Sequence, residues 1–191
     1  RMEMEIGEPA IHAAETASHA SPLDASQAGQ VQALAHAFYE VVPAHLRTYC
    51  SLTSRIAQAT LTRLGIPATL TPCQVWLSVP GNNYVIGFLG NQPRAGKWDG
   101  HVVCSAGDWF IDAALHHFKL EFGQDTPAVV ASRKFQARTL AIARVDLSAT
   151  DRLVWMAPPA GIDATPPAEP PELVAQYSGL LADRLAAGQP R

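Results

Sequence analysis

From residue 49 to residue 68 the chain reads YCSLTSRIAQATLTRLGIPA. Apolar side chains recur at helical spacing among good helix formers, at Leu52, Ile56, Ala59 and Leu64. Gly65 permits the left-handed residue that commonly ends a helix, and Pro67 cannot continue one. The stretch therefore predicts a helix over residues 51–64, with Cys50 at its start and a turn into a strand behind it.

A two-residue period replaces the helical one after Pro67, because apolar and polar side chains alternate from Ala68 to Val79. Turn residues at 80–83 separate this strand from an apolar, strand-like run at 84–89. Further strands are predicted at residues 101–104, 109–113, 139–147 and 153–156. Helices first and a mainly antiparallel sheet afterwards indicate the α+β fold class.

The two ends of the chain differ in composition from its middle. Residues 1–26 show no sustained periodicity, so we expect a flexible leader, whereas residues 27–42 carry apolar side chains at helical spacing. Six prolines within residues 157–171 favour an extended linker. The predicted organisation is a leader (1–26), one domain (27–156), the proline-rich linker (157–171), and a C-terminal helix and tail (172–191).

Composition narrows the functional classes. The chain has 191 residues, 14 Lys and Arg against 17 Asp and Glu, and a formal net charge of −3. A single domain of this length can bury a sufficient core without disulfides or metal. The lack of a basic cluster argues against a nucleic-acid partner, and no apolar stretch approaches the roughly 20 residues that cross a bilayer. We expect neither a signal peptide nor a membrane anchor, and the odd count of three cysteines favours a reducing, cytoplasmic location.

Cys50 occupies a position at which a thiolate is stabilised. The first N–H groups of a helix lack intrahelical acceptors, and the positive end of the helix dipole favours an anion. The same N–H groups can hold the oxyanion that develops during acyl transfer. The simpler alternative is a buried structural cysteine, because free cysteines are commonly buried.

His101 and Asp112 flank a predicted β-hairpin. With the turn centred between Ala106 and Gly107, antiparallel pairing places His101 directly opposite Asp112 on one face. Cβ atoms roughly 4.5–5.5 Å apart let a carboxylate hold and orient an imidazole. The same register pairs Val103 with Phe110, Val102 with Ile111, and Cys104 with Trp109. We interpret His101 and Asp112 as a base and its orienting group; the alternative is a structural pair whose members satisfy each other.

Two blocks of the sequence resemble a known family. The run Tyr49-Cys50-Ser51-Leu52-Thr53-Ser54-Arg55-Ile56, continuing to Leu64-Gly65-Ile66-Pro67-Ala68, resembles the nucleophile helix of the transglutaminase-like superfamily. The block Trp98-Asp99-Gly100-His101-Val102-Val103, followed by Asp108-Trp109-Phe110-Ile111-Asp112-Ala113, is similar to the His and Asp strands of that superfamily. The resemblance covers about residues 45–115. It implies a papain-like core in which the nucleophile helix packs on a mainly antiparallel sheet.

By this resemblance, Cys50 is the nucleophile, His101 the general base and acid, and Asp112 the group that orients His101. The Arg-Gly-Gly-x-Cys approach of arylamine acetyltransferases is absent, which disfavours an acetyl-CoA donor. No Gln stands shortly before Cys50 as it does in papain, so Gln74 is the candidate for the second oxyanion donor. Trp98 is a candidate for the substrate site. No cofactor is implied.

The histidines at 116 and 117 offer a competing interpretation as a metal site, together with His101 and Cys104. Their spacing matches no common zinc signature, and adjacent residues of a strand point to opposite faces, so we expect no metal. The leading hypothesis is a cysteine enzyme that acts on a peptide or protein amide through a thioester at Cys50, as a peptidase, amidase or acyl transferase. The alternative is a catalytically silent domain that docks a protein partner through its proline-rich linker and terminal helix.

Overall fold

The computed structural model describes residues 21–90, 98–136 and 140–188. The helical elements within these residues are α1 (Ala25–Val41), the 3₁₀ turn η1 (Ala44–Leu46), α2 (Cys50–Arg63), α3 (His117–Phe122) and α4 (Pro171–Ala187). The strands are β1 (Thr69–Pro72), β2 (Gln74–Val79), β3 (Asn82–Ile86), β4 (Val102–Ala106), β5 (Trp109–Asp112), β6 (Val130–Arg133), β7 (Ala141–Asp146) and β8 (Arg152–Met156). The predicted α+β class is confirmed.

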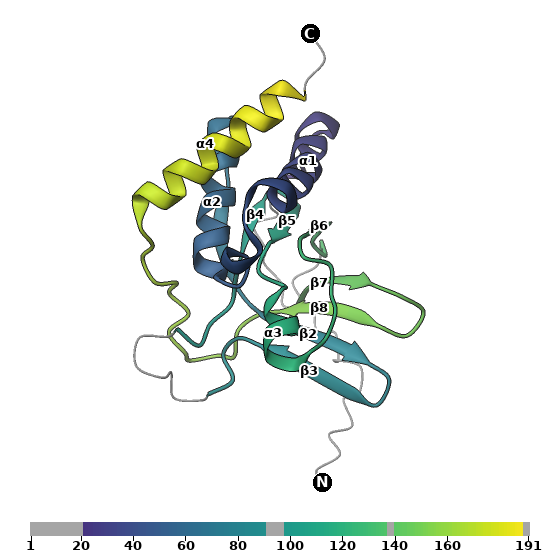
Figure 1. Cartoon of the computed structure of the whole chain (residues 1–191). Helices are drawn as coiled ribbons and strands as arrows, with labels where there is room; N and C mark the ends of the chain where they lie inside the picture. Colours follow the sequence, from purple (N-terminus) through teal and green to yellow (C-terminus); the bar gives the residue numbers. More distant parts are fainter. Residues whose placement is uncertain (1–20, 91–97, 137–139, 189–191) are drawn as a thin grey trace.

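The described strands form two antiparallel sheets, in the orders β1-β4-β5-β6 and β3-β2-β8-β7. Helices α1, α2 and α4 lie together beside the first sheet, and the second sheet lies away from α1 and α4 (Figure 1). Only Cys73 separates β1 from β2, and its N–H donates to the carbonyl of His101 at 3.0 Å. The chain therefore passes from one sheet to the other beside the candidate histidine.

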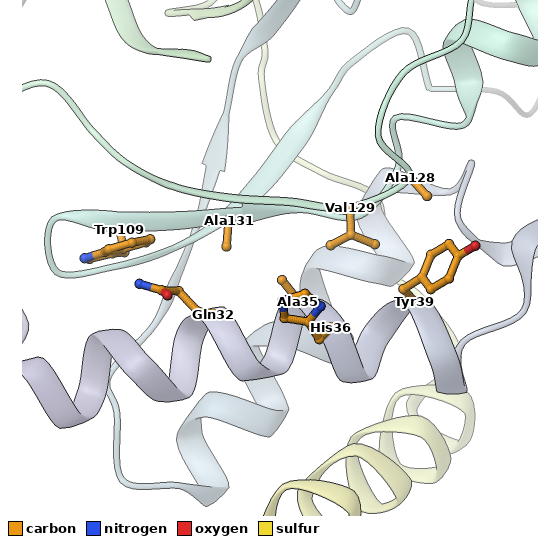
Figure 2. A pocket seen from close by; sticks show the side chains of 8 residues that line it. All are labelled: Gln32, Ala35, His36, Tyr39, Trp109, Ala128, Val129 and Ala131. Carbon is orange, nitrogen blue, oxygen red and sulfur yellow. The ribbon is translucent and has the colours of Figure 1, made fainter. Parts of the chain in front are cut away.

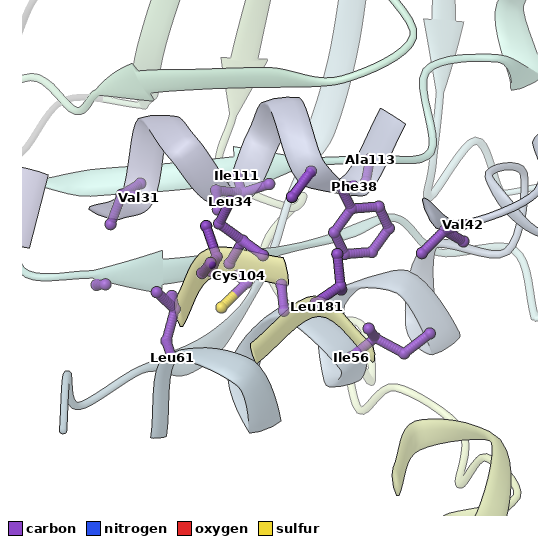
Figure 3. Packing of buried hydrophobic residues seen from close by; sticks show 14 of the residues in the cluster. Val31, Leu34, Phe38, Val42, Ile56, Leu61, Cys104, Ile111, Ala113 and Leu181 are labelled. Atoms are coloured by element: carbon purple, nitrogen blue, oxygen red, sulfur yellow. The ribbon is translucent and has the colours of Figure 1, made fainter. Parts of the chain in front are cut away.

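The β4–β5 hairpin is buried on both faces. Cys104 and Ile111 face the helices and pack with side chains of α1, α2 and α4, including Phe38, Ile56 and Leu181 (Figure 3). The opposite face packs against the second sheet, in a cluster that contains Val103, Phe110, Val75, Leu153 and Trp155. Because each large apolar side chain contributes about 1.5–3 kcal/mol on burial, these two clusters hold the hairpin firmly between its neighbours.

Local sequence signals explain where the first two helices begin and end. Asp24 caps α1, since its carboxylate accepts from the N–H of Gln27 while the Gln27 side chain accepts from the N–H of Asp24. The helix therefore begins at Ala25, inside the stretch assigned to the leader. Helix α2 ends before Gly65, whose φ of +75° is the left-handed conformation expected there.

Three elements were absent from the sequence prediction, namely η1, α3 and β6. His116 and His117 lie at the start of α3, so the continued strand considered for them is wrong. The single strand predicted over residues 68–79 is wrong, because the chain passes from one sheet to the other at Cys73 and the stretch forms both β1 and β2. The other predicted elements agree with the structure to within a few residues, except that Thr139 lies outside the described residues. Within the described ranges, no helix is long and apolar enough to cross a bilayer.

The proline-rich segment runs between β8 and α4 without forming a helix or strand. Its Pro167 carbonyl accepts hydrogen bonds from Ser51 Oγ and from Arg55 Nη2, both at 2.9 Å. Helix α4 then packs on α1 and α2, and its Leu181 belongs to the same core as theirs. The C-terminal segment is thus fastened to the first turns of α2.

Candidate active site

Cys50 is the first residue of α2, and this helix has no side-chain cap. The N–H of Thr53 donates to the Tyr49 carbonyl at 2.9 Å. The N–H groups of residues 50–52 therefore precede this first hydrogen bond of the helix. Cys50 is partly exposed, and its Sγ lies 3.8 Å from the carbonyl oxygen of Gly100, to which the thiol donates. The hydroxyl of Ser54 donates to the Val102 carbonyl at 2.9 Å, which fastens this helix to β4.

His101 and Asp112 form a direct, buried pair. His101 Nε2 lies 2.7 Å from Asp112 Oδ2, and each residue is only 1% exposed. The same Oδ2 accepts the indole N–H of Trp155 at 2.9 Å, and Oδ1 accepts the N–H of Ala114 at 3.0 Å. The carboxylate of Asp112 therefore has hydrogen-bonding partners on both of its oxygens.

The predicted register of the hairpin is wrong by two residues. Cys104 pairs with Ile111 and Ala106 with Trp109, because the turn consists of Gly107 and Asp108. His101 is therefore diagonal to Asp112 and not directly opposite. Since side chains alternate faces with a period of two, an even shift leaves both residues on the same face. A hydrogen bond can span the diagonal because the imidazole is long.

Electrostatics favour the charged forms of this pair. Burial alone would lower the pKa of His101, but attraction to Asp112, the hydrogen bond between them, and contact with the Cys50 side chain raise it to about 10. Burial alone would raise the pKa of Asp112, yet attraction to His101 and the hydrogen bonds from His101, Trp155 and Ala114 hold it below its usual value. An imidazolium bonded to a carboxylate is thus expected at neutral pH. Because Nε2 bonds to Asp112, Nδ1 is the ring nitrogen left for the Cys50 thiol.

Close backbone packing fixes the position of His101. Gly87 has a φ of +94°, and a Cβ built on it would lie 2.8 Å from the Cβ of His101 and 3.0 Å from the Cys73 carbonyl oxygen. Only glycine fits this approach, because real Cβ atoms do not come so near to a neighbour. The histidine is therefore held between Gly87 and Asp112.

The structure places Trp98 next to the Cys50–His101 region. Its ring lies against Gly100, where an added Cβ would come within 2.1 Å of a ring atom, and Gly100 supplies the carbonyl that the Cys50 thiol contacts. Phe88 meets this ring edge-on, with centroids 5.6 Å apart. The substrate role of Trp98 stays a prediction that this position supports.

Gln74 lies on β2, where its amide is engaged within the protein. Its Nε2 donates to the Phe88 carbonyl at 3.2 Å, and its Oε1 accepts from the indole of Trp76 at 3.4 Å. Among the described residues, no hydrogen bond joins Gln74 to Cys50. The role of Gln74 as an oxyanion donor stays a prediction that these contacts do not favour.

The other two cysteines are fully buried. Burial, joined by repulsion from Asp112 and Cys50, raises the pKa of Cys73, and burial raises the pKa of Cys104 to about 12.

The side chain of His117, which was considered as a metal ligand, bonds to Glu121 on α3. No three His, Cys, Asp or Glu side chains in the described part of the chain are grouped so that they could hold a metal ion.

A hollow of about 530 Å³ lies between α1 and the first sheet. Figure 2 shows Gln32, His36 and Tyr39 of α1 on one side of it, with Trp109 and Ala131 on the other. None of Cys50, His101 and Asp112 lines it, so this hollow is separate from the candidate site.

Sequence reasoning missed the roles of Trp155 and Gly87. Trp155 is recognisable as a buried strand residue, because it lies two residues after Leu153 on β8 and therefore on the same buried face. No local signal indicates that its N–H reaches Asp112, since the two residues belong to different sheets and are 43 positions apart. A glycine at the end of a strand is a recognised signal of close backbone approach, and Gly87 could have been found that way.

Comparison with known proteins gives little further information. No family model matches the chain, and no curated protein matches it. One solved structure, described only as the crystal structure of a genomics target, is 10% identical, with a TM-score of 0.35, over 89% of this chain and 82% of that one. That similarity is too low to support a common fold.

Proposed function

We propose that this chain is a cysteine enzyme of the transglutaminase-like type, with a papain-like core, that acts on a peptide or protein amide through a thioester at Cys50. The observation that carries the proposal is the buried His101–Asp112 pair beside Cys50 at the start of α2, where the Cys50 thiol lies 3.8 Å from the carbonyl oxygen of Gly100, the residue before His101. This combination supplies a nucleophile, a proton carrier and its orienting group.

In the proposed reaction, the Cys50 thiolate attacks the carbonyl carbon of the amide, and the carbonyl electron pair moves onto oxygen. The N–H groups at the start of α2 stabilise this oxyanion. When the intermediate collapses, the C–N bond breaks, the amine leaves with a proton from His101, and the thioester remains. Water or a second amine then gives a proton to His101 and attacks the thioester, which releases the Cys50 thiolate.

Hydrolysis and acyl transfer need the same residues, so peptidase, amidase and transferase activities all lie within the proposal. The half-buried Trp98 and its partner Phe88 provide an apolar contact for the substrate near Cys50. A mechanism that depends on a reduced thiol suits a reducing compartment such as the cytoplasm.

The proposal is tested by measuring the rate of iodoacetamide alkylation of Cys50 against pH, with the labelled peptide identified by mass spectrometry. The proposed mechanism requires a Cys50 thiolate at neutral pH, so it requires alkylation to begin well below pH 8.5, roughly the usual pKa of a free thiol. His101→Gln should move the onset of alkylation towards that ordinary range. A folded His101→Gln protein with an unchanged profile would contradict the proposed role of His101.

The second candidate, a catalytically silent domain that binds a protein partner, is favoured by the complete burial of His101 and Asp112. It predicts that the alkylation rate of Cys50 rises only near and above pH 8.5, as for an ordinary thiol. Reaction of the native protein with an electrophilic peptide-amide probe, lost in Cys50→Ser, would favour the enzyme.

A further inference from the structure

The indole of Trp155 links the second sheet to the candidate site. This residue of β8 is fully buried, and its Nε1–H donates to Asp112 Oδ2 at 2.9 Å, on the same oxygen that bonds to His101 Nε2 at 2.7 Å. Its ring packs edge-on against Phe110 of β5, with centroids 4.8 Å apart. The indole is thus held by packing from the strand that carries Asp112.

The two oxygens of Asp112 are held by donors of different origin. Oδ1 accepts the N–H of Ala114, two residues along the same chain segment, whereas Oδ2 receives the donor from β8. An indole N–H can only donate, so Trp155 suits a carboxylate that must remain an acceptor. Without it, the bond to His101 would be the one described contact left to Oδ2.

We propose that Trp155 is a positioning residue for the candidate triad: its N–H fixes Asp112 Oδ2 opposite His101 and so orients the imidazole towards Cys50. This inference rests on the proposed function. The residue does not touch the reacting atoms and acts through Asp112. The second sheet, which supplies none of Cys50, His101 and Asp112, thereby takes part in the geometry of the site.

Few other titratable groups act on the buried pair. In the described part of the chain, Asp112 and Cys50 act on His101, and His101 acts on Asp112. Asp112 and Cys50 act in turn on Cys73. Burial raises the pKa of Cys73 well above its ordinary value, so it stays neutral over the range of the experiment. A shift in the alkylation profile of Cys50 therefore reports on the triad.

The test compares Trp155→Phe with Trp109→Phe. Both variants keep an aromatic ring and lose an indole N–H, but the N–H of Trp109 is buried without an acceptor among the described residues. Loss of a hydrogen bond to a charged group should move the onset of Cys50 alkylation in Trp155→Phe upwards by about one pH unit, a tenfold lower rate on the rising limb. Trp109→Phe should keep the native profile. Equal profiles in the two variants would show that Trp155 is only a packing residue.

A second measurement needs no variant and covers the case in which Trp155→Phe does not fold. In the NMR spectrum of the unaltered protein, the indole N–H of Trp155 should exchange slowly with solvent, and its resonance should shift together with those of the His101 ring when Asp112 takes up a proton in acid. Fast exchange, or a resonance that does not shift in that titration, would contradict the proposed role of Trp155 as the residue that positions Asp112. If Cys50 of the unaltered protein alkylates as an ordinary thiol, the proposed function fails, whereas the NMR result still decides whether Trp155 holds Asp112.

Discussion

Gly87 is the position at which one added methyl group should disturb the site most directly. Its φ of +94° costs a non-glycine residue about 1–2 kcal/mol, by analogy with the left-handed region. The new Cβ would also lie 2.8 Å from His101 Cβ and 3.0 Å from the His101 nitrogen and the Cys73 oxygen. Those contacts are with main-chain atoms or Cβ, so no side-chain rotation relieves them. Overpacking of this kind adds about 1–3 kcal/mol.

Gly81→Ala is the matched control, because Gly81 has a φ of +77° and no atom within 4 Å of an added Cβ. It should carry only the backbone cost, so Gly87→Ala should be less stable than Gly81→Ala by about 1–3 kcal/mol in urea unfolding. The displaced imidazole should also slow alkylation of Cys50 in Gly87→Ala alone. Equal stability and equal alkylation in the two variants would refute the reasoning that Gly87 holds His101 in place.

Three further predictions concern the buried charges, the thiols and the proline-rich segment. Asp112→Asn should lower the free energy of unfolding by roughly 3–5 kcal/mol, since it leaves His101 buried without its charged partner. In urea unfolding, this loss should be greatest between about pH 4 and pH 6.5, where both groups are charged in the folded protein. The loss should shrink as the pH rises through about 10, where His101 loses its proton, and as the pH falls through the lowered pKa of Asp112. A thiol reagent at neutral pH should label Cys50 in the folded protein but Cys104 only after unfolding, and simultaneous labelling would contradict the burial of Cys104. Ser51→Ala should cost about 1 kcal/mol and speed proteolysis within residues 157–170, because it removes the hydrogen bond to Pro167; an unchanged cleavage rate would show that this contact does not hold the segment.

The parts of the fold that sequence reasoning predicted well are those with a local cause. Helix α2 follows from its apolar spacing and from the stop at Gly65, and the structure reproduces it with a shift of one residue at each end. The hairpin follows from two apolar runs around a short turn. Its register was wrong because Gly107 and Asp108, rather than Ala106 and Gly107, form the turn. The prediction that His101 and Asp112 share a face is still correct, because the register error is an even number of residues.

The parts that could not be predicted depend on contacts between distant segments. The short strand β6 is defined by its pairing with β5, as Asp112 with Val130 and Trp109 with Arg133. Its own few residues carry little periodicity, so no window of the sequence identifies it. The hydrogen bond from Trp155 to Asp112 likewise requires knowledge of how the two sheets pack. Sequence patterns specify which face of a strand is buried, but they do not specify which residue lies against it.

The chemical identity of the His101–Asp112 pair argues for a role beyond stability. A buried ion pair is weak evidence for stability, because apolar side chains of similar volume are often equally stable in its place. Apolar clusters already cover both faces of the hairpin, so the fold has no need of charges at this point. What an apolar pair could not provide is a proton-bearing ring in contact with the thiol of Cys50. Titratable groups with shifted pKa values concentrate at functional sites. Here the groups that interact with the pair or within it are Asp112 on β5, Trp155 on β8 and Cys50 on α2.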